Sequence, residues 1–277
     1  MIRLVCLGSS AAQPTSRSVP SHFAVKFGGV WLFDCAEGCQ RQMMKYNVPY
    51  GQVSAIFLTH LHADHVLGLA GLVQTLNMTE RKEALPIFGP PGTKAFLETL
   101  FSLANFAPDF RIAPFEVSHT EKTVCVDEKL FQIRSFPVNH STKAVGYVLE
   151  EKAKTKFHEE KAKAMGIKGR LFTQIMEKGK IKVGDRTISL KEVTFQESGK
   201  KIVLTGDTEP CASVVENARG ANVLVHEATF DEKQKAKARK TRHSTALEAG
   251  KQAKAADVKK LILTHFGNRY EDRRKLV

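Results

Sequence analysis

The most constraining feature of this sequence is a cluster of three histidines and one aspartate within six residues. His60, His62, Asp64 and His65 follow the apolar run 54–58, which predicts a buried strand. A short loop at the end of such a strand brings alternate side chains together. Neutral imidazole favours zinc and other borderline metals, and a carboxylate adds an oxygen ligand for a second ion. The cluster therefore predicts a metal site.

Three later segments of the chain deliver further potential ligands in the same way. The β-rich apolar runs 131–136, 201–205 and 260–264 are followed by His140, Asp207 and His265, respectively. By itself, a histidine at such a place is more typical of a buried structural residue or a surface residue. In combination with the first cluster, these residues predict a set of seven ligands.

The donor types divide this set between two ions. His60, His62 and His140 suit the first ion, Asp64, His65 and His265 suit the second, and Asp207 can bridge both. Two ions held in this way stabilise the attacking and leaving oxygens together and lower the pKa of a water toward neutrality. Such a site suits the hydrolysis of a phosphodiester, which is a poor electrophile because its negative charge repels hydroxide.

Motifs elsewhere in the chain resemble those of a known family. They are LFDCAEG (32–38), GDT (206–208), HEATF (226–230), HST (243–245), and Thr264-His265 followed by Arg269-Tyr270. Together with the H-x-H-x-D-H loop, they are similar to the motifs of the RNase Z family, the tRNA 3′-processing endoribonucleases of the metallo-β-lactamase superfamily. The resemblance extends from residue 2 to about residue 272.

The resemblance implies a fold, an activity and partners. It implies an α/β protein built as a four-layer αβ/βα sandwich with a protruding flexible arm, and a homodimer in which each subunit holds two Zn²⁺. It implies that the substrate is precursor tRNA, which is cut after the discriminator nucleotide to leave a 3′-hydroxyl. Periodicity alone predicts only a mixed α/β domain over residues 1–277.

Three residues are predicted to carry the chemistry. Asp64 is expected to serve both as a metal ligand and as the general base that orients the nucleophile. His243 is expected to donate a proton to the departing 3′-oxygen, because the pKa of an imidazole lies close to neutrality. Glu227 is expected to accept a hydrogen bond from His243 and to keep it aligned.

Hydrophobic patterns predict the elements that carry these residues. Strands are expected at 2–7, 23–27, 30–33, 86–89, 114–117, 123–126, 130–136, 144–149, 201–205, 222–226 and 259–263. One uninterrupted helix is expected from about Asp64 to Leu76, a second is expected to end near Asn105, and two more are expected at 210–218 and 244–256.

Residues 151–200 interrupt this pattern. They are rich in lysine and contain little apolar sequence, which is typical of a disordered surface loop. The alternative is an inserted tRNA-binding arm, because Gly166, Gly169, Arg170 and Lys178 lie in a pattern similar to the arm of the RNase Z family. In that family the arm of one subunit clamps the tRNA elbow above the active site of its partner. The resemblance therefore implies that these four residues bind substrate.

The positive charge of the chain is concentrated in three segments. Residues 151–201 carry a net charge of +7, residues 231–243 of +4 and residues 268–277 of +2, and together they account for the whole +13. Lysine-rich helices are often only solvated surfaces. Two of these segments, however, flank His243 and His265, and basic patches attract phosphate backbones. The charge therefore favours a polyanionic substrate.

Two arginines outside the arm are also predicted to bind substrate. Arg17 lies in the loop after the first strand, which resembles a family loop that approaches the tRNA acceptor end. Arg269 follows the last predicted ligand by four residues and is expected to hold the scissile phosphate. Both side chains are therefore expected to contact phosphate groups.

Composition limits the cellular setting. No run approaches the roughly 20 apolar residues of a membrane span, and Gly8 ends the N-terminal apolar segment too early for a signal peptide. The five cysteines are an odd number without a zinc-finger pair, so Cys35 and Cys39 are expected to be buried or idle thiols. Such thiols favour a reducing cytoplasm.

Two other functions stay open at this point. A general metal-dependent phosphodiesterase, which acts on cyclic nucleotides or aryl diesters, would have a metal site of the same appearance. A non-catalytic RNA-binding chaperone would keep the basic arm but would need no complete set of ligands. The seven predicted ligands favour an enzyme over the chaperone.

Overall fold

The structure of the chain, a computed structural model, describes residues 2–103 and 107–270. It divides into two compact units. The larger unit takes the described parts of 1–128, 132–150 and 200–277, and the smaller unit comprises Lys129–Phe131 and Glu151–Gly199. Each unit has its own apolar core.

The first half of the larger unit is a six-stranded sheet. Its strands, in spatial order, are β1 (Arg3–Gly8), β2 (His22–Lys26), β3 (Val30–Phe33), β4 (Val53–Phe57), β5 (Leu85–Gly89) and β6 (Ile112–Glu116). Strands β1 to β3 are antiparallel, and β3 to β6 are parallel. The helical elements of this half are α1 (Cys39–Lys45), η1 (Tyr50–Gln52), α2 (Ala63–Val66), α3 (Leu69–Met78) and α4 (Thr93–Leu103).

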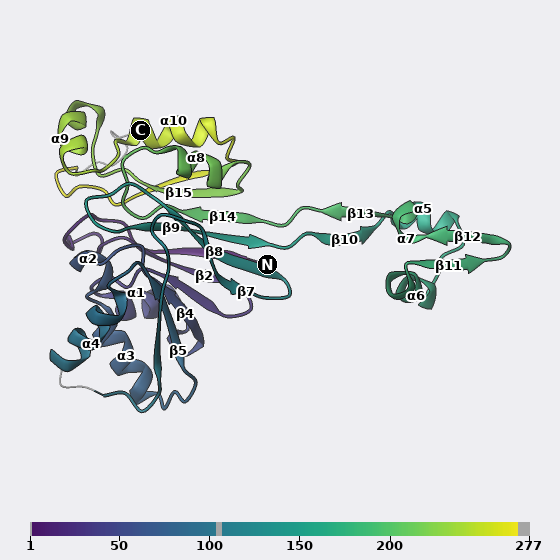
Figure 1. The fold of residues 1–277 in the computed structure, drawn as a ribbon, viewed down its shortest axis with the longest axis horizontal. Helices are drawn as coiled ribbons and strands as arrows, with labels where there is room; N and C mark the ends of the chain where they lie inside the picture. Colours follow the sequence, from purple (N-terminus) through teal and green to yellow (C-terminus); the bar gives the residue numbers. More distant parts are fainter. Residues whose placement is uncertain (1, 104–106, 271–277) are drawn as a thin grey trace. The chain divides into compact units, whose positions relative to one another are not determined.

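The second half is another six-stranded sheet. Its spatial order is β16 (Leu261–Thr264), β15 (Val223–Glu227), β14 (Lys201–Leu204), β9 (Val145–Glu151), β8 (Phe131–Pro137) and β7 (Thr123–Asp127). The helical elements of this half are α8 (Ala212–Ala218), η2 (Glu232–Gln234), α9 (Lys235–Lys240) and α10 (Ala246–Ala255). In Figure 1 the two sheets lie between an outer layer that contains α1, α3 and α4 and an outer layer that contains α8 and α10. The four-layer α/β sandwich is therefore confirmed.

Successive side chains of each strand point to opposite faces of the sheet, and this alternation builds the layers. In β4, Ile56 packs in the core cluster with the helices of the first half, and the next residue, Phe57, stacks on Phe33 and Phe88. Tyr147, from β9 of the other sheet, packs against Phe33 and Phe57 at centroid distances of 5.8 and 5.4 Å. Its hydroxyl donates a hydrogen bond to the carbonyl of Leu58 at 2.8 Å. Aromatic side chains therefore fill the space between the sheets, as period-two alternation requires.

The single helix expected from Asp64 to Leu76 is wrong, because the helix is interrupted between α2 and α3. Gly68 lies at this break, where its N–H donates to the carbonyl of Cys35 at 2.8 Å. A β-carbon at this position would lie 2.0 Å from the carbonyl oxygen of Ala36. The backbone of another loop therefore packs against the break, which only glycine permits. The apolar positions continue through it, so their periodicity gives no sign of it.

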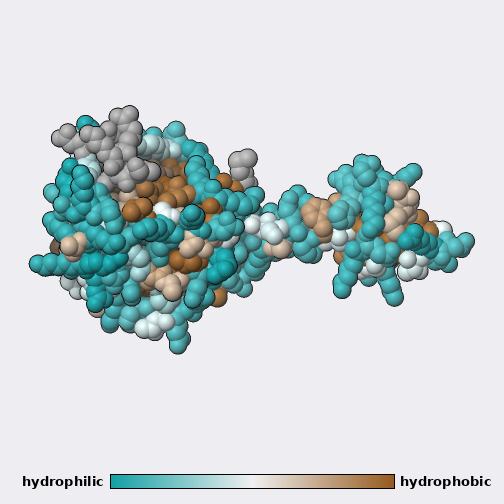
Figure 2. Space-filling view, turned by 90° about the horizontal axis from the view of Figure 1, so that it is seen from above, coloured by the Kyte–Doolittle hydropathy of each residue, from teal (hydrophilic) through white to brown (hydrophobic). Residues whose placement is uncertain are grey.

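The smaller unit is folded, which excludes the disordered surface loop and agrees with the alternative of an inserted unit at 151–200. Its elements are β10 (Lys154–Phe157), α5 (Glu159–Ala164), α6 (Arg170–Lys178), β11 (Lys180–Val183), β12 (Arg186–Ser189), α7 (Leu190–Val193) and β13 (Thr194–Glu197). Its core contains the buried side chains of Ala162, Ile167, Ile175, Ile181, Ile188 and Val193. Figure 2 shows mainly hydrophilic residues on the visible face of this unit, with hydrophobic ones between them.

Most predicted elements of the larger unit agree with the structure to within about two residues. Helices α1 and α9 were not predicted from the sequence. Each is short and follows a loop. Asn105, the expected end of α4, lies outside the described residues. Within the part of the chain that the structure describes, no helix is both long and apolar enough to cross a membrane.

Replacing Gly68 by alanine is expected to destabilise the protein strongly. The added methyl group would overlap the carbonyl of Ala36, and overpacking of this kind costs roughly 1–3 kcal/mol or more. The matched control is Gly51→Ala, because a β-carbon on Gly51 meets nothing within 4 Å. Urea unfolding of both variants measures the two costs. Equal free energies of unfolding would contradict the steric explanation.

Candidate metal centre

The predicted ligands lie where the chain leaves the strands of both sheets. His60, His62, Asp64 and His65 follow β4, and His140 follows β8. Asp207 follows β14, and His265 follows β16 directly. Side chains that are separated by up to 205 residues thus meet in the larger unit, where three groups of ligand atoms lie within 4.8 Å of one another: His60, His62 and His140; His60, His65 and Asp207; and Asp64, His65 and His265. The first and third groups have the composition predicted for the two ions, and the second places Asp207 beside one residue of each.

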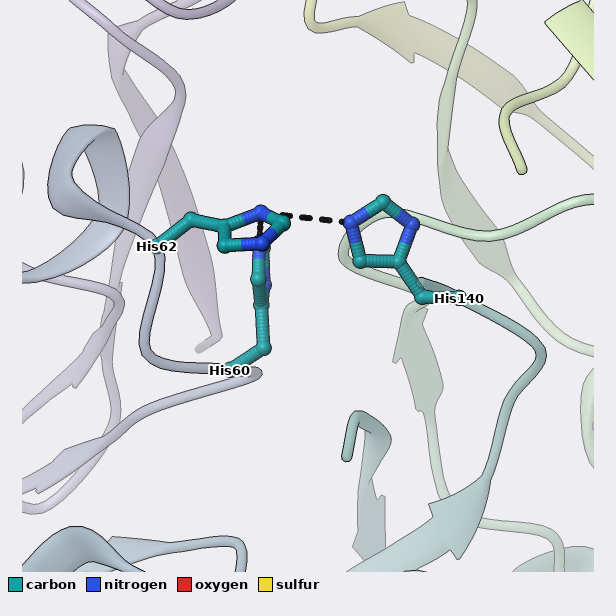
Figure 3. Close-up of side chains that lie close together, drawn as sticks. All are labelled: His60, His62 and His140. Atoms are coloured by element: carbon teal, nitrogen blue, oxygen red, sulfur yellow. Dashed lines mark hydrogen bonds between the residues drawn. The ribbon is translucent and has the colours of Figure 1, made fainter. Parts of the chain in front are cut away.

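The first group is made of three imidazole rings. Figure 3 shows His60 and His62 on one loop and His140 opposite them. The Nδ1 atom of His62 lies 3.0 Å from Nε2 of His60 and 3.3 Å from Nε2 of His140. Burial, followed by the charge of His65, lowers the pKa of His60 well below its ordinary value. Burial also lowers the pKa of His62 and of His140. The rings are therefore neutral, which is the form that binds metal.

The second group joins Asp64 and Asp207 to two imidazoles. Nε2 of His265 lies 3.3 Å from Oδ2 of Asp64 and 3.3 Å from Oδ2 of Asp207. The same oxygen of Asp207 lies 3.5 Å from Nε2 of His65 and 3.7 Å from Nε2 of His60. Asp207 therefore lies between the two groups of ligands.

Two buried atoms of this group test whether a metal fits. Nε2 of His65 and Oδ1 of Asp207 make no hydrogen bond to any described residue, and both side chains are buried. A buried polar atom without a partner is costly. Cations would satisfy both atoms, and the donor set of imidazoles and carboxylates is typical of zinc. The residues present therefore fit a pair of divalent ions.

Hydrogen bonds fix the orientation of four of the rings. His65 donates from Nδ1 to Asp34 at 2.7 Å, and His140 donates from Nδ1 to the carbonyl of Arg242 at 3.0 Å. Nδ1 of His60 contacts the hydroxyl of Thr59 at 3.0 Å, and Nδ1 of His265 contacts the hydroxyl of Thr229 at 2.9 Å. Both hydroxyls donate to carboxylates, so they accept from the rings. In all four rings Nε2 faces other proposed ligands or, in His65, has no hydrogen-bond partner among the described residues, so a metal bond there would replace only contacts within the ligand set.

Asp34 is a positioning residue that the sequence did not single out. Its carboxylate accepts hydrogen bonds from His65 and from both the backbone N–H and the hydroxyl of Thr59, at 2.7, 2.7 and 3.0 Å. It follows the apolar strand β3 directly, as the ligands follow theirs. An acidic residue directly after a buried strand was the available signal. Thr229, the partner of His265, was likewise not singled out from the sequence, although it lies within the HEATF motif.

Asp64 is held by groups from both sides of the site. Its Oδ2 accepts a hydrogen bond from the backbone N–H of Ala12 at 2.9 Å and lies 3.3 Å from His265. Burial raises the pKa of Asp64, but a hydrogen bond with His265 and the charges of His65 and His265 outweigh burial and lower the pKa to about 2. The carboxylate is therefore ionised at neutral pH and is suited to bind a cation.

The expected hydrogen bond between Glu227 and His243 is present. Nδ1 of His243 donates to Oε1 of Glu227 at 2.7 Å. Glu227 also accepts from the N–H of Thr208 and the hydroxyl of Thr229, at 2.9 and 2.6 Å. Burial lowers the pKa of His243, but the charge and hydrogen bond of Glu227 outweigh it and raise the pKa to about 9. The ring is therefore a protonated group beside the ligands.

His243 also belongs to two further groups of potential metal ligands. They are His140, Asp207 and His243, and Glu227, His243 and His265. The short bond to a buried carboxylate occupies Nδ1 of His243 and favours the charged ring. His65 makes the same kind of bond to Asp34, so the metal content of a His243 variant is the measurement that separates a proton donor from a ligand.

The residues predicted to bind substrate lie in two places. Arg17 is exposed in the loop before β2, and the guanidinium of Arg269 lies over the rings of Phe230 and Tyr270 at 4.9 and 5.8 Å. In the smaller unit, Gly166 and Gly169 adopt φ values of 83° and 52° between α5 and α6, and Arg170 and Lys178 are the exposed first and last residues of α6.

Cys35 and Cys39 are buried free thiols, as expected.

Comparisons with known proteins agree with this geometry. A model of the beta-lactamase superfamily domain matches residues 31–159. Ribonuclease Z of Haloferax volcanii is 40% identical over 274 residues, which cover 97% of this chain and 86% of that protein. Ribonuclease Z of Methanothermobacter thermautotrophicus is 39% identical over 98% of this chain and 88% of that protein.

A solved structure gives the same result for the fold. The crystal structure of human tRNase Z, short form, is similar with a TM-score of 0.75 at 27% identity, and it covers 98% of this chain and 95% of that chain. Sequence and structure thus match over nearly the whole length. The chain therefore belongs to the ribonuclease Z family, the metal-dependent nucleases of the metallo-β-lactamase superfamily.

Proposed function

We propose that this protein is a zinc-dependent endoribonuclease that removes the 3′ trailer from tRNA precursors. It cleaves after the discriminator nucleotide and leaves a 3′-hydroxyl on the tRNA. The observation that carries the proposal is the placement of His243, hydrogen-bonded to the buried carboxylate of Glu227, beside two groups of potential metal ligands. The names of the relatives, ribonuclease Z and tRNase Z, support the choice of substrate.

Two Zn²⁺ per subunit fit the donor set. His60, His62 and His140 would hold one ion, Asp64, His65 and His265 would hold the other, and Asp207 would contact both. When bound, such ions supply an activated water and neutralise the charge on the non-bridging oxygens of the phosphate. The hydrogen bonds at Nδ1 already orient four of these rings for binding.

The side chains of the protein perform the remaining steps. Asp64 orients the nucleophilic water, and Ala12 fixes the orientation of its carboxylate through a backbone hydrogen bond. His243 donates a proton to the departing 3′-oxygen, while Glu227 holds its Nδ1 atom. The negative charge of Glu227 also keeps His243 protonated until the leaving group needs the proton. Arg17 and Arg269 contact phosphate groups of the substrate.

The smaller unit is the tRNA-binding arm in this proposal. Gly166 and Gly169 shape its turn, and Arg170 and Lys178 present positive charge at the two ends of α6. Its many exposed lysines suit a phosphate backbone. The protein acts as a homodimer in the cytoplasm, so that the arm of one subunit holds a tRNA bound at the active site of its partner.

Cleavage of a defined precursor tests the activity itself. A labelled tRNA precursor with a 3′ trailer is expected to yield tRNA that ends at the discriminator nucleotide and a trailer with a 5′-phosphate. End mapping of both products checks the position of the cut and the end groups. A cut at another position, or no cut with zinc present, would contradict the proposal.

His243→Ala is expected to lower kcat by about 10² to 10⁴ without loss of metal, because it removes only the proton donor. Elemental analysis should find two zinc ions per chain in the wild type and in the variant. Glu227→Gln is the companion variant, because it keeps the size of the side chain but removes the negative charge that holds the proton on His243. Loss of one zinc from His243→Ala would show that His243 is a ligand.

Deletion of the smaller unit is expected to affect the cleavage of two substrates differently. Glu150 pairs with Lys201 in the ladder of β9 and β14, so Asn-Gly in place of residues 152–199 should close a tight hairpin. This variant should lose precursor tRNA cleavage and keep the hydrolysis of a nitrophenyl phosphodiester. An equal loss on both substrates would argue against a role in tRNA binding. Unchanged tRNA cleavage would show that the smaller unit is not needed to hold the substrate.

A further inference from the structure

The segment between β15 and α10 carries positive charge that the proposed function has not used. Residues 233–242 contain six lysines and arginines in ten positions. Two of these cations have partners: Lys235 lies 2.9 Å from Glu232, and Arg239 forms an ion pair with Glu248. Glu248 belongs to the first turn of α10, so the ion pair of Arg239 connects α9 to that helix.

Three lysines of the same segment have no such partner. Lys233, Lys237 and Lys240 are exposed and form no ion pair with any residue in the described ranges. Lys237 and Lys240 are three residues apart on α9 and share one face of it, and Lys233 lies in η2, directly before α9. We call these three residues the lysine stripe. Like charges at this spacing repel one another, and a bound polyanion would relieve that repulsion.

The lysine stripe is fixed to the metal centre by the loop that follows α9. Lys240 precedes His243 by three residues, and the backbone N–H of His243 donates to the carbonyl of Ala238 at 2.9 Å. The carbonyl of Arg242 accepts the hydrogen bond from the ligand His140. Figure 1 shows α9 at the same end of the larger unit as α2, which carries Asp64 and His65. The C-terminal end of the stripe, at Lys240, is therefore three residues from the proposed proton donor.

We propose that the lysine stripe binds phosphates of the RNA strand on the 5′ side of the scissile bond. This inference rests on the proposed function, because His243 would protonate a 3′-oxygen that belongs to the nucleotide on that side. The stripe spans about 10 Å at the rise of a helix, whereas an RNA strand advances only a few ångströms per nucleotide. The stripe can therefore contact two or three successive phosphates.

The test removes the three charges together. The variant is Lys233→Ala, Lys237→Ala and Lys240→Ala in the full chain. The matched control removes the same charge from three exposed lysines, Lys254, Lys259 and Lys260, which precede the start of β16, whereas His265 follows its end. Thermal melting checks that both variants fold. Binding of a labelled tRNA precursor is measured by fluorescence anisotropy between 50 and about 300 mM salt, and cleavage is measured on the same RNA.

The stripe variant is expected to bind the precursor at least about tenfold more weakly than the wild type. The slope of log Kd against log salt should fall by about two, because each phosphate contact contributes slightly less than one. KM should rise for the precursor, and turnover of a nitrophenyl phosphodiester should not change. Substitution of the three lysines by arginine should restore binding. The control variant should stay within about twofold of the wild type.

Two results would overturn the inference. Equal affinity and salt slope in the stripe variant and the control would show that the lysine stripe is only a solvated surface. A loss of diester turnover in the stripe variant would show that it acts through the structure of the site. Binding is measured apart from cleavage, so a wild-type protein that binds RNA through the stripe without cutting it would reject the proposed function alone.

Discussion

The metal centre depends on hydrogen bonds at the Nδ1 atoms of four ligand histidines. An imidazole that donates from Nδ1 presents its lone pair at Nε2, so each bond selects both the tautomer and the direction of the ring. The acceptors are a carboxylate, two threonine hydroxyls and a backbone carbonyl, all supplied by the fold. The protein therefore organises the ligands by itself, and an ion does not have to reorient the rings. Asp34 matters most here, because it holds His65 directly and Thr59, the partner of His60.

One threonine links the ligand set to the proposed proton donor. The hydroxyl of Thr229 donates to Glu227 at 2.6 Å and accepts from His265 at 2.9 Å. Glu227 in turn accepts from His243. The proton-donor pair and the last metal ligand thus share one chain of buried hydrogen bonds, so a change at any of these positions affects the others.

The ligands could be predicted from sequence because each follows an apolar strand, and strand ends bring distant residues together. Asp34 also follows a strand, but its contact with His65 could not be predicted, because it depends on the parallel pairing of β3 and β4, which periodicity does not reveal. The break at Gly68 was hidden for a similar reason, since its cause is the carbonyl of Ala36 in another loop. The elements of the smaller unit could not be located from the sequence, because few apolar residues, spread over 151–199, form its core.

The separate core of the smaller unit has a consequence for how recognition can diversify. Its apolar residues, such as Ile175 and Ile188, pack among themselves and not with the strands that carry the ligands. Its exposed lysines can therefore be exchanged, gained or lost at little cost to the stability of the catalytic part. If the smaller unit binds tRNA as proposed, the preference for RNA can change within one compact segment while the metal centre stays constant.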